Sequence, residues 1–329
     1  MLKLTSRNIL EITQLKTSFY IKKEWHSAVN DINLSVEEGE ILGIVGESGS
    51  GKSVISLSVM QLLPEKIAKI EEGEIVFKGK RVDNISENDY NQLRGKELSM
   101  IFQEPMTALN PVFTIGNQLT EKIMLHLKLN KSEARAKAID LLNQVGIPRA
   151  AEVIDNYPHQ LSGGMRQRVM IALAISCSPD LLIADEPTTA LDVTVQAQIL
   201  ELLRKIRKET NMSIIFISHD LAVISELCDR VAVMYAGNII ETGTTNEIFK
   251  SPKHPYTQAL IRSIPKLDSD VEKLEVIEGS VPSLVNMPKV GCKFANRCPH
   301  VMDICKTENV ALKSIDAKHK VACHLYDEQ

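Results

Sequence analysis

The sequence predicts an α/β fold built on a parallel sheet, and three observations support this class. Short apolar runs rich in β-branched residues, such as Ile41–Val45, are typical of buried parallel strands. Segments of helical periodicity alternate with such runs along much of the chain. A glycine-rich turn connects Ile41–Val45 to a helical pattern that stops at Pro64. Alternating strands and helices indicate an α/β core.

Local patterns predict the individual elements. Alternating apolar and polar residues predict strands at 10–19 and 28–36, and short apolar runs predict strands at 72–79 and 100–103. A helical block at about 107–176 indicates an inserted helical subdomain. Strands and helices alternate again beyond it, with strands at 180–184 and 213–217, a helix at 193–210 and a closing hairpin at 231–242.

Bulk properties limit the function classes. A chain of 329 residues suggests about two domains, and its composition of 44% hydrophobic and 24% charged residues is that of an ordinary globular protein. The net charge of −4 argues against nucleic acid as a partner. No apolar run approaches the roughly 18 residues of a membrane-spanning helix, and the N-terminus lacks the core of a signal peptide. We therefore expect a cytoplasmic chain whose cysteines are reduced or bind a metal.

The motif with the clearest chemistry is GESGSGKS at residues 46–53. It matches the phosphate-loop pattern G-x-x-x-x-G-K-[ST] in the required strand-to-helix context. Backbone N–H groups of such a loop, together with the following helix N-terminus, bind phosphates. Lys52 is expected to reach the β- and γ-phosphates, and the Ser53 hydroxyl to bind Mg²⁺. The predicted nucleotide site therefore comprises Gly46, Glu47, Ser48, Gly49, Ser50, Gly51, Lys52 and Ser53.

Two adjacent carboxylates end the apolar strand of LLIADEP. Asp185 can hold Mg²⁺, usually through water, and Glu186 can act as general base on the attacking water. An isolated match of this kind is as often a solvated acidic turn, but its place after a phosphate loop favours a catalytic role.

The stretch LSGGM predicts a second anion-binding helix end. Ser162 is a suitable N-cap, and Gly163 and Gly164 open the helix that follows. A chain with one phosphate loop rarely needs two such ends for one nucleotide, so this end is expected to serve a nucleotide held by another subunit. Taken alone, the three residues would indicate only a capped helix.

Two polar residues each end a strand. His219 could touch a γ-phosphate, and Gln103 could orient water or reach Mg²⁺. Each would be an ordinary structural or exposed residue if it stood alone.

In order along the chain, GESGSGKS, Gln103, LSGGM, LLIADEP, the Ala190-Leu191-Asp192 run and His219 resemble the motifs of an ABC transporter nucleotide-binding subunit, over residues 8–250. The resemblance implies a P-loop ATPase with a RecA-like core, an N-terminal antiparallel β subdomain and an inserted helical subdomain. It also implies that two cassettes close head to tail on two ATP molecules, each held between one phosphate loop and the other cassette's Ser162–Gly164.

The same resemblance implies roles for single residues. Glu186 would be the catalytic base, with Lys52, Gln103 and His219 as further catalytic residues. Asp192 would lie at the interface between cassettes. The segment after Gln103, residues 104–111, would transmit ATP binding to the permease. The aromatic side chain that stacks on adenine would be Phe19 or Tyr20, with Trp25 a weaker candidate.

Finer details resemble the ATPases of dipeptide and oligopeptide importers, whose nickel-importing relatives share much of the pattern. The matching stretches are FQEPMTALNP, residues 254–260 and the cysteine-containing tail. This implies an ATP-hydrolysing subunit at the cytoplasmic face of the membrane, paired with a second ATPase, or with itself in isolation. Two permeases and a separate extracellular or periplasmic peptide-binding protein would complete the importer.

Rival interpretations come from other classes. A soluble ABC ATPase acting on DNA would need a long coiled coil, for which the segment between Gly46 and Leu161 is too short, and a ribosome-type member would carry two cassettes. A regulatory subunit that binds ATP without hydrolysis is disfavoured by the presence of Glu186 and His219.

We expect residues 1–250 to form the nucleotide-binding domain and residues 251–329 a smaller extension with four cysteines. Their spacing, C-x5-C-x6-C-x17-C, lacks the close pairs typical of zinc sites. A [4Fe–4S] cluster, with zinc as the alternative, is therefore the predicted occupant, and the tail that peptide-importer ATPases carry supports a metal centre. Inert buried thiols and a disulfide remain alternatives. The four predicted ligands are Cys292, Cys298, Cys305 and Cys323.

Overall fold

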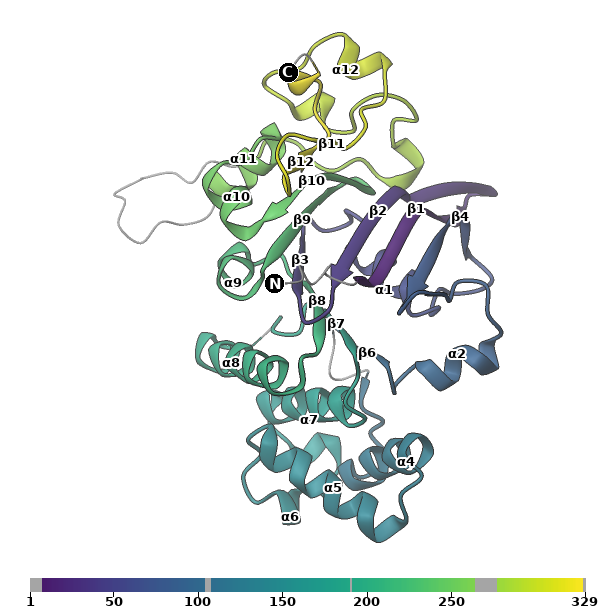
Figure 1. Cartoon of the computed structure of the whole chain (residues 1–329), viewed down its shortest axis with the longest axis vertical. Helices are drawn as coiled ribbons and strands as arrows, with labels where there is room; N and C mark the ends of the chain where they lie inside the picture. The colour runs from purple at the N-terminus through teal and green to yellow at the C-terminus, as the bar shows by residue number, and fades with distance from the viewer. Residues whose placement is uncertain (1–7, 104–107, 190, 264–276, 328–329) are drawn as a thin grey trace, which may run out of the picture. The chain divides into compact units, whose positions relative to one another are not determined.

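The computed structural model describes residues 8–103, 108–189, 191–263 and 277–327 (Figure 1). The chain forms two compact units. The helical unit comprises Met1–Ile9, Glu37–Gly39 and Asn84–Ile215, and the phosphate-loop unit comprises Leu10–Val36, Glu40–Asp83 and Phe216–Gln329. This division differs from the sequence-based domain boundary near residue 250, which stays a prediction.

The helical unit carries three strands of an eight-stranded sheet and most of the helices. Its strands β6 (Leu98–Ile101) and β7 (Leu181–Asp185) are parallel, and β8 (Ser213–Ile217) lies beside β7 and continues into the other unit. Its helices are α2 (Glu87–Leu93), α4 (Ile115–Leu127), α5 (Lys131–Gln144), α6 (Ala150–Val153), the short η1 (Pro158–Gln160), α7 (Gly163–Ile175) and α8 (Val193–Thr210). The helical block predicted at about 107–176 thus contains α4–α7.

Side-chain caps explain where these helices begin. Thr114 accepts a hydrogen bond from the Asn117 N–H at the start of α4. Asn130 and Glu133 form a reciprocal capping box at the start of α5. Such caps satisfy N–H groups that the first turn of a helix leaves without a partner.

The phosphate-loop unit contains an antiparallel sheet of order β2-β1-β4-β5. Its members are β1 (Asn8–Ile21), β2 (Glu24–Glu37), β4 (Ala68–Phe77) and β5 (Lys80–Arg81). The register of β1 on β4 pairs Leu10 with Phe77 and Ile12 with Ile75, which places apolar residues opposite one another. The antiparallel β subdomain that the resemblance implied is therefore confirmed.

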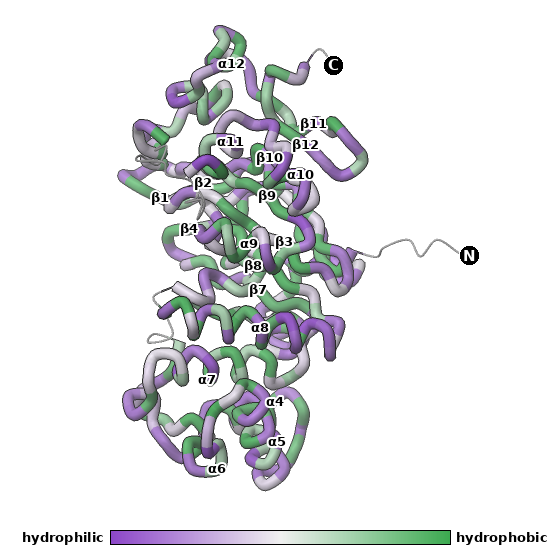
Figure 2. Tube along the Cα trace, turned by 90° about the vertical axis from the view of Figure 1, so that its left-hand side faces the viewer, coloured by the Kyte–Doolittle hydropathy of each residue, from purple (hydrophilic) through white to green (hydrophobic). Residues whose placement is uncertain are grey.

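The second, eight-stranded sheet contributes to this unit the strand that precedes the phosphate loop. β3 (Ile41–Val45) lies parallel to β9 (Arg230–Tyr235), which pairs antiparallel with β10 (Asn238–Thr244). All residues of β3, β7 and β8 are buried, and Figure 2 shows these strands as largely hydrophobic. Full burial on both faces is the reason that they read as continuous apolar runs. Helices α1 (Lys52–Val59) and α9 (Leu221–Leu227) follow β3 and β8.

The C-terminal extension joins this second sheet instead of standing apart from it. Strand β12 (Lys320–Val321) pairs antiparallel with β10 and with β11 (Lys313–Ser314). The remaining elements here are α10 (Thr245–Lys250), α11 (Pro255–Arg262), α12 (Ile304–Thr307) and the short helices η2 (Leu284–Asn286), η3 (Ala295–Arg297) and η4 (His324–Tyr326).

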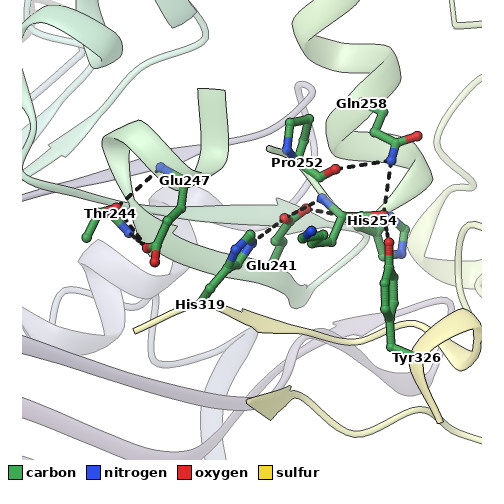
Figure 3. Close-up of polar contacts among 9 residues, drawn as sticks. Glu241, Thr244, Glu247, Pro252, His254, Gln258, His319 and Tyr326 are labelled. Carbon is green, nitrogen blue, oxygen red and sulfur yellow. Dashed lines mark hydrogen bonds and ion pairs between the residues drawn. The ribbon is translucent and has the colours of Figure 1, made fainter. Parts of the chain in front are cut away.

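A buried polar network anchors the extension to β10 (Figure 3). The Nε2 of His319 lies 2.7 Å from Oε1 of Glu241, and both side chains are almost completely buried. Glu241 also accepts hydrogen bonds from the backbone N–H groups of Lys253 and His254. The hydroxyl of Tyr326 donates to the carbonyl oxygen of Lys253. One buried carboxylate thus holds both ends of the extension.

Among the described residues, no helix is both long enough and apolar enough to span a membrane.

Candidate functional site

The phosphate loop between β3 and α1 depends on glycine for its backbone path. Gly46 has φ +155°, and a Cβ at this position would lie 2.2 Å from the carbonyl oxygen of Met234. Gly51 has φ +101° at the N-cap of α1, and a Cβ there would lie 2.9 Å from the carbonyl oxygen of Ala28. Both positions therefore exclude a side chain for steric as well as conformational reasons.

The side chains of the loop provide hydrogen-bond donors for an anion. Lys52 is buried, and its ammonium donates to the carbonyl oxygens of Gly46 (2.8 Å) and Glu47 (3.2 Å). Ser48 and Ser53 are exposed. Ser50 Oγ is buried and has no hydrogen-bond partner within the described part of the chain. A lysine, three hydroxyls and a helix N-terminus around a glycine-rich turn fit a nucleoside triphosphate, and the role of Ser53 as an Mg²⁺ ligand stays a prediction.

The two carboxylates lie at the end of β7, as predicted. Asp185 is buried, and Glu186 is half-buried with φ +48°, a left-handed backbone conformation that is unfavourable for a glutamate. Two donors orient its carboxylate. Gln103 Nε2 and Thr189 Oγ1 each donate to Oε2 of Glu186 over 3.0 Å. The fold therefore unites Gln103 and Glu186, which the sequence offered as separate candidates.

The Ser-Gly-Gly stretch forms an exposed helix start. Ser162 is the N-cap of α7, and its Oγ accepts a hydrogen bond from the Met165 N–H. Ser162 and Gly163 are exposed, and a Cβ on Gly163 would meet no heavy atom within 4 Å. The Ser-Gly-Gly end of this 13-residue helix is thus exposed, and its role in binding an anion stays a prediction.

The remaining predicted residues occupy separate positions. His219 is exposed just beyond the end of β8. Phe19 is half-buried, whereas Tyr20 is 46% exposed and its ring lies 5.3 Å from that of Trp25, measured between centroids. Of the two adenine-stacking candidates, Tyr20 is the more accessible.

Two predicted features involve residues outside the described ranges. In the segment expected to contact the permease, residues 104–107 are not described. In the run Ala190-Leu191-Asp192, Ala190 is not described. Asp192 is described as the N-cap of α8, where its Oδ1 accepts a hydrogen bond from the Val195 N–H over 2.9 Å. Its expected role at an interface stays a prediction.

Sequence reasoning missed three residues that contact the predicted site. Thr189 lies three positions after Glu186, and its hydroxyl was a usable signal. Tyr256 and Arg297 contact Glu47 from more than 200 residues away, and only the fold brings them there.

The predicted iron–sulfur cluster is wrong, and its zinc alternative has no support. Within the described ranges, no group of three or more His, Cys, Asp or Glu side chains is arranged to hold a metal ion. Burial raises the pKa of the Cys292 and Cys298 thiols and raises that of Cys323 to about 11. The four cysteines Cys292, Cys298, Cys305 and Cys323 are free thiols that line one small pocket.

Taken together, the phosphate loop, the oriented carboxylate after β7 and the exposed Ser-Gly-Gly helix start define an ATPase of the ATP-binding-cassette class. Comparisons with known proteins agree. A family model described as ABC transporter matches residues 29–189, and one described as oligopeptide/dipeptide transporter, C-terminal region, matches residues 240–305.

Curated relatives match over nearly the whole chain. The oligopeptide transport ATP-binding protein AppD of Bacillus subtilis (strain 168) is 51% identical over 98% of both chains. The dipeptide transport ATP-binding protein DppD of Escherichia coli (strain K12) is 49% identical over 96% of both. None of these descriptions includes an iron–sulfur cluster.

Solved structures show the same fold. The dimeric ATP-binding cassette MJ0796, bound to ADP and phosphate, superimposes with a TM-score of 0.65 at 25% identity, over 72% of this chain and 98% of that one. The cassette cbiO1 of Clostridium perfringens gives a TM-score of 0.63 at 28% identity, over 74% and 91%.

The chain belongs to the ABC transporter family of ATP-binding proteins, in its oligopeptide and dipeptide transport branch. Its activity is accordingly ATP hydrolysis coupled to transport, and its cofactors are ATP and Mg²⁺.

Proposed function

We propose that this chain is the ATP-hydrolysing subunit that powers uptake of dipeptides or oligopeptides through partner permeases. The observation that carries the proposal is the near-complete match to AppD and DppD, including the tail region shared by peptide transporters. The described contacts support a hydrolytic role, because the Glu186 carboxylate is oriented by two donors.

The roles proposed for single residues rest on the motifs of the ABC transporter family. Lys52 and the loop N–H groups neutralise and position the phosphates. Ser53 and Asp185 are the residues that would hold Mg²⁺, which would supply charge neutralisation at the phosphate oxygens. Glu186 accepts the proton of the attacking water, and Gln103 orients its carboxylate. His219 contacts the γ-phosphate, and Tyr20, rather than Phe19, stacks on adenine.

A second subunit completes each ATP site. The partner's Ser-Gly-Gly helix start, the counterpart of residues 162–164, contacts the nucleotide held by the phosphate loop of this chain. In turn, the start of α7 in this chain contacts the nucleotide held by the partner. The MJ0796 cassette is dimeric, which supports a two-subunit assembly, and we propose a non-identical ATPase as the physiological partner of this chain. The assembly lies at the cytoplasmic face of the membrane, against two permeases that receive peptide from a separate binding protein.

Uptake of a labelled dipeptide by cells tests the function. Cells lacking the chain are complemented with wild type, Lys52→Ala, Glu186→Gln or the control Lys66→Ala, which removes an exposed lysine that has no hydrogen bond or ion pair among the described residues. Wild type and Lys66→Ala should restore uptake. Lys52→Ala should abolish it, and Glu186→Gln should reduce it at least about a hundredfold, as loss of a general base implies.

The outcomes separate the parts of the proposal. Equal uptake with wild type and Lys52→Ala would refute an ATP-driven peptide importer. If Lys52→Ala lost uptake of labelled nickel but took up dipeptide as wild type does, the chain would be assigned to metal import instead. Unchanged ATP turnover in Glu186→Gln would remove Glu186 as general base.

A further inference from the structure

Arg297, in the C-terminal extension, forms an ion pair with the phosphate loop. Its NH1 lies 3.1 Å from each carboxylate oxygen of Glu47, the second residue of the loop. The Arg297 side chain is 7% exposed and that of Glu47 is 27% exposed. A charged pair with this little access to water is stronger and less screened by salt than a surface pair.

The rest of the guanidinium is fully engaged by its surroundings. The same NH1 donates to the hydroxyl of Tyr235 (3.2 Å), and Nε donates to the carbonyl oxygen of Glu278 (2.8 Å). NH2 donates to the carbonyl oxygens of Ile277 (3.2 Å) and Gly279 (3.4 Å). Each of the three guanidinium nitrogens therefore has an acceptor. A lysine has no planar fork and could not make all these bonds at once.

Glu47 is held at its backbone as well as at its side chain. Its N–H donates to the hydroxyl of Tyr256 over 3.0 Å, and its carbonyl oxygen accepts from Lys52 Nζ and from the Ser50 N–H. Tyr256 is fully buried in α11, and burial raises the pKa of its hydroxyl, so this acceptor is neutral. The loop residue is thus fixed from three directions, two of which start beyond residue 250.

An aromatic cluster makes this support rigid. The rings of Tyr235 and Tyr256 lie 4.8 Å apart, and Phe294 packs edge-on against both at 5.2 and 5.4 Å. The guanidinium of Arg297 lies 5.7 Å from the centroid of Tyr235 and 5.9 Å from that of Phe294. Packed aromatic rings leave an arginine little rotamer freedom, which lowers the entropic cost of holding it in one geometry.

We propose that Arg297 is a positioning residue of the ATP site, which holds Glu47 so that the phosphate loop is formed before nucleotide binds. The C-terminal extension then contributes to the ATP site by raising its affinity for ATP. This inference rests on the proposed function, because it assumes that the loop binds ATP. Positioning residues of this kind raise affinity by removing the cost of ordering a loop at the moment of binding.

The test is equilibrium binding of a fluorescent, non-hydrolysable ATP analogue with Mg²⁺ to the full chain. Arg297→Gln should weaken binding about tenfold, the factor associated with one charge-assisted hydrogen-bonded pair. Arg297→Lys should lie between Arg297→Gln and wild type. The control Lys289→Gln, which also removes one positive charge from the extension but whose exposed side chain has no described contact, should bind as wild type does.

A double-mutant cycle separates positioning from general support of the fold. In a Glu47→Gln background, Arg297→Gln should change the Kd by less than about twofold, because the pair is already broken. In the assembled transporter, Arg297→Gln should raise KM for ATP while kcat stays within about twofold of wild type. Circular dichroism confirms folding, and Glu47→Gln tests the same link without altering the extension.

Three results would overturn the inference: wild-type binding by Arg297→Gln, wild-type binding by Glu47→Gln, or an Arg297→Gln effect that persists in the Glu47→Gln background. Lys52→Ala distinguishes this failure from failure of the proposed function. If Lys52→Ala loses the analogue and Arg297→Gln does not, only the inference fails. If Lys52→Ala binds as tightly as wild type, the proposed ATP site itself is wrong.

Discussion

Replacing His319 by alanine should release the C-terminal extension from β10. The Glu241 carboxylate that His319 contacts is completely buried, and His319 is 1% exposed (Figure 3). Removing the imidazole leaves this carboxylate with the two backbone donors of Lys253 and His254. Losing the partner of a buried hydrogen-bonding group costs about 1–3 kcal/mol. The Glu241 carboxylate is completely buried but keeps two donors, so we expect a loss in the upper part of this range, about 2–3 kcal/mol.

Native-state hydrogen exchange measures this loss at the strand itself. The Ala322 N–H donates to the carbonyl oxygen of Ile240 over 2.8 Å, so its exchange reports separation of β12 from β10. A loss of 2–3 kcal/mol corresponds to a fall in protection of roughly 30- to 150-fold. His319→Gln keeps a donor and should lose less. The control is His300→Ala, which truncates an exposed histidine of the same extension. Protection of the Ala322 amide within about threefold of wild type in His319→Ala would refute the anchoring role of Glu241.

Three further predictions concern the same unit. Burial lowers the pKa of His254 to about 3, below its usual 6.5, so the unfolded chain binds more protons between these values and stability falls with falling pH. From pH 7 to pH 5 the free energy of unfolding should fall by about 2 kcal/mol, as measured by urea unfolding. His254→Asn, which still caps α11 but does not titrate, should lack this fall. Equal pH dependence of the unfolding free energy in wild type and His254→Asn would contradict the prediction. Gly46→Ala should abolish nucleotide binding in the same analogue titration, because its Cβ would meet the Met234 carbonyl, and retained affinity would show that the loop can adjust. Tyr20→Ala should raise the Kd for ATP about tenfold, as loss of one stacked base implies, whereas an unchanged Kd would move the stacking role to Phe19 or Trp25.

The sequence predicts those parts of the fold that depend on local patterns. The helix expected at 193–210 and the strand at 213–217 match α8 and β8 residue for residue. Their signals are a capping aspartate, a periodic apolar face and a five-residue buried run. Strand β1 runs from Asn8 to Ile21 and so exceeds the predicted 10–19 by two residues at each end. Pairing partners lie far away in sequence, and no local pattern reports them.

In the candidate site, too, local motifs could be predicted from the sequence, whereas contacts between distant residues could not. The glycines and Lys52 of the phosphate loop could be predicted, because one backbone turn requires them at fixed spacing. The hydrogen bond from Gln103 to Glu186 joins residues 83 positions apart, and the ion pair from Arg297 to Glu47 joins residues 250 apart. The cysteine prediction failed for a related reason. Spacing along the chain suggested four ligands, but ligation depends on where the fold places the four sulfur atoms, and within the described residues they form no group arranged to hold a metal ion.

The two compact units carry different parts of the chemistry. The phosphate-binding residues belong to the phosphate-loop unit, and Gln103, Asp185, Glu186 and Thr189 belong to the helical unit. Every contact of the extension described above, from Arg297, Tyr256, His319 and β12, is made with the phosphate-loop unit. Because transition-state contacts affect kcat and ground-state contacts affect KM, a change in the extension should act on ATP affinity and leave proton transfer by Glu186 unaltered. A variant of the extension that lowered kcat at saturating ATP, with affinity unchanged, would contradict this separation.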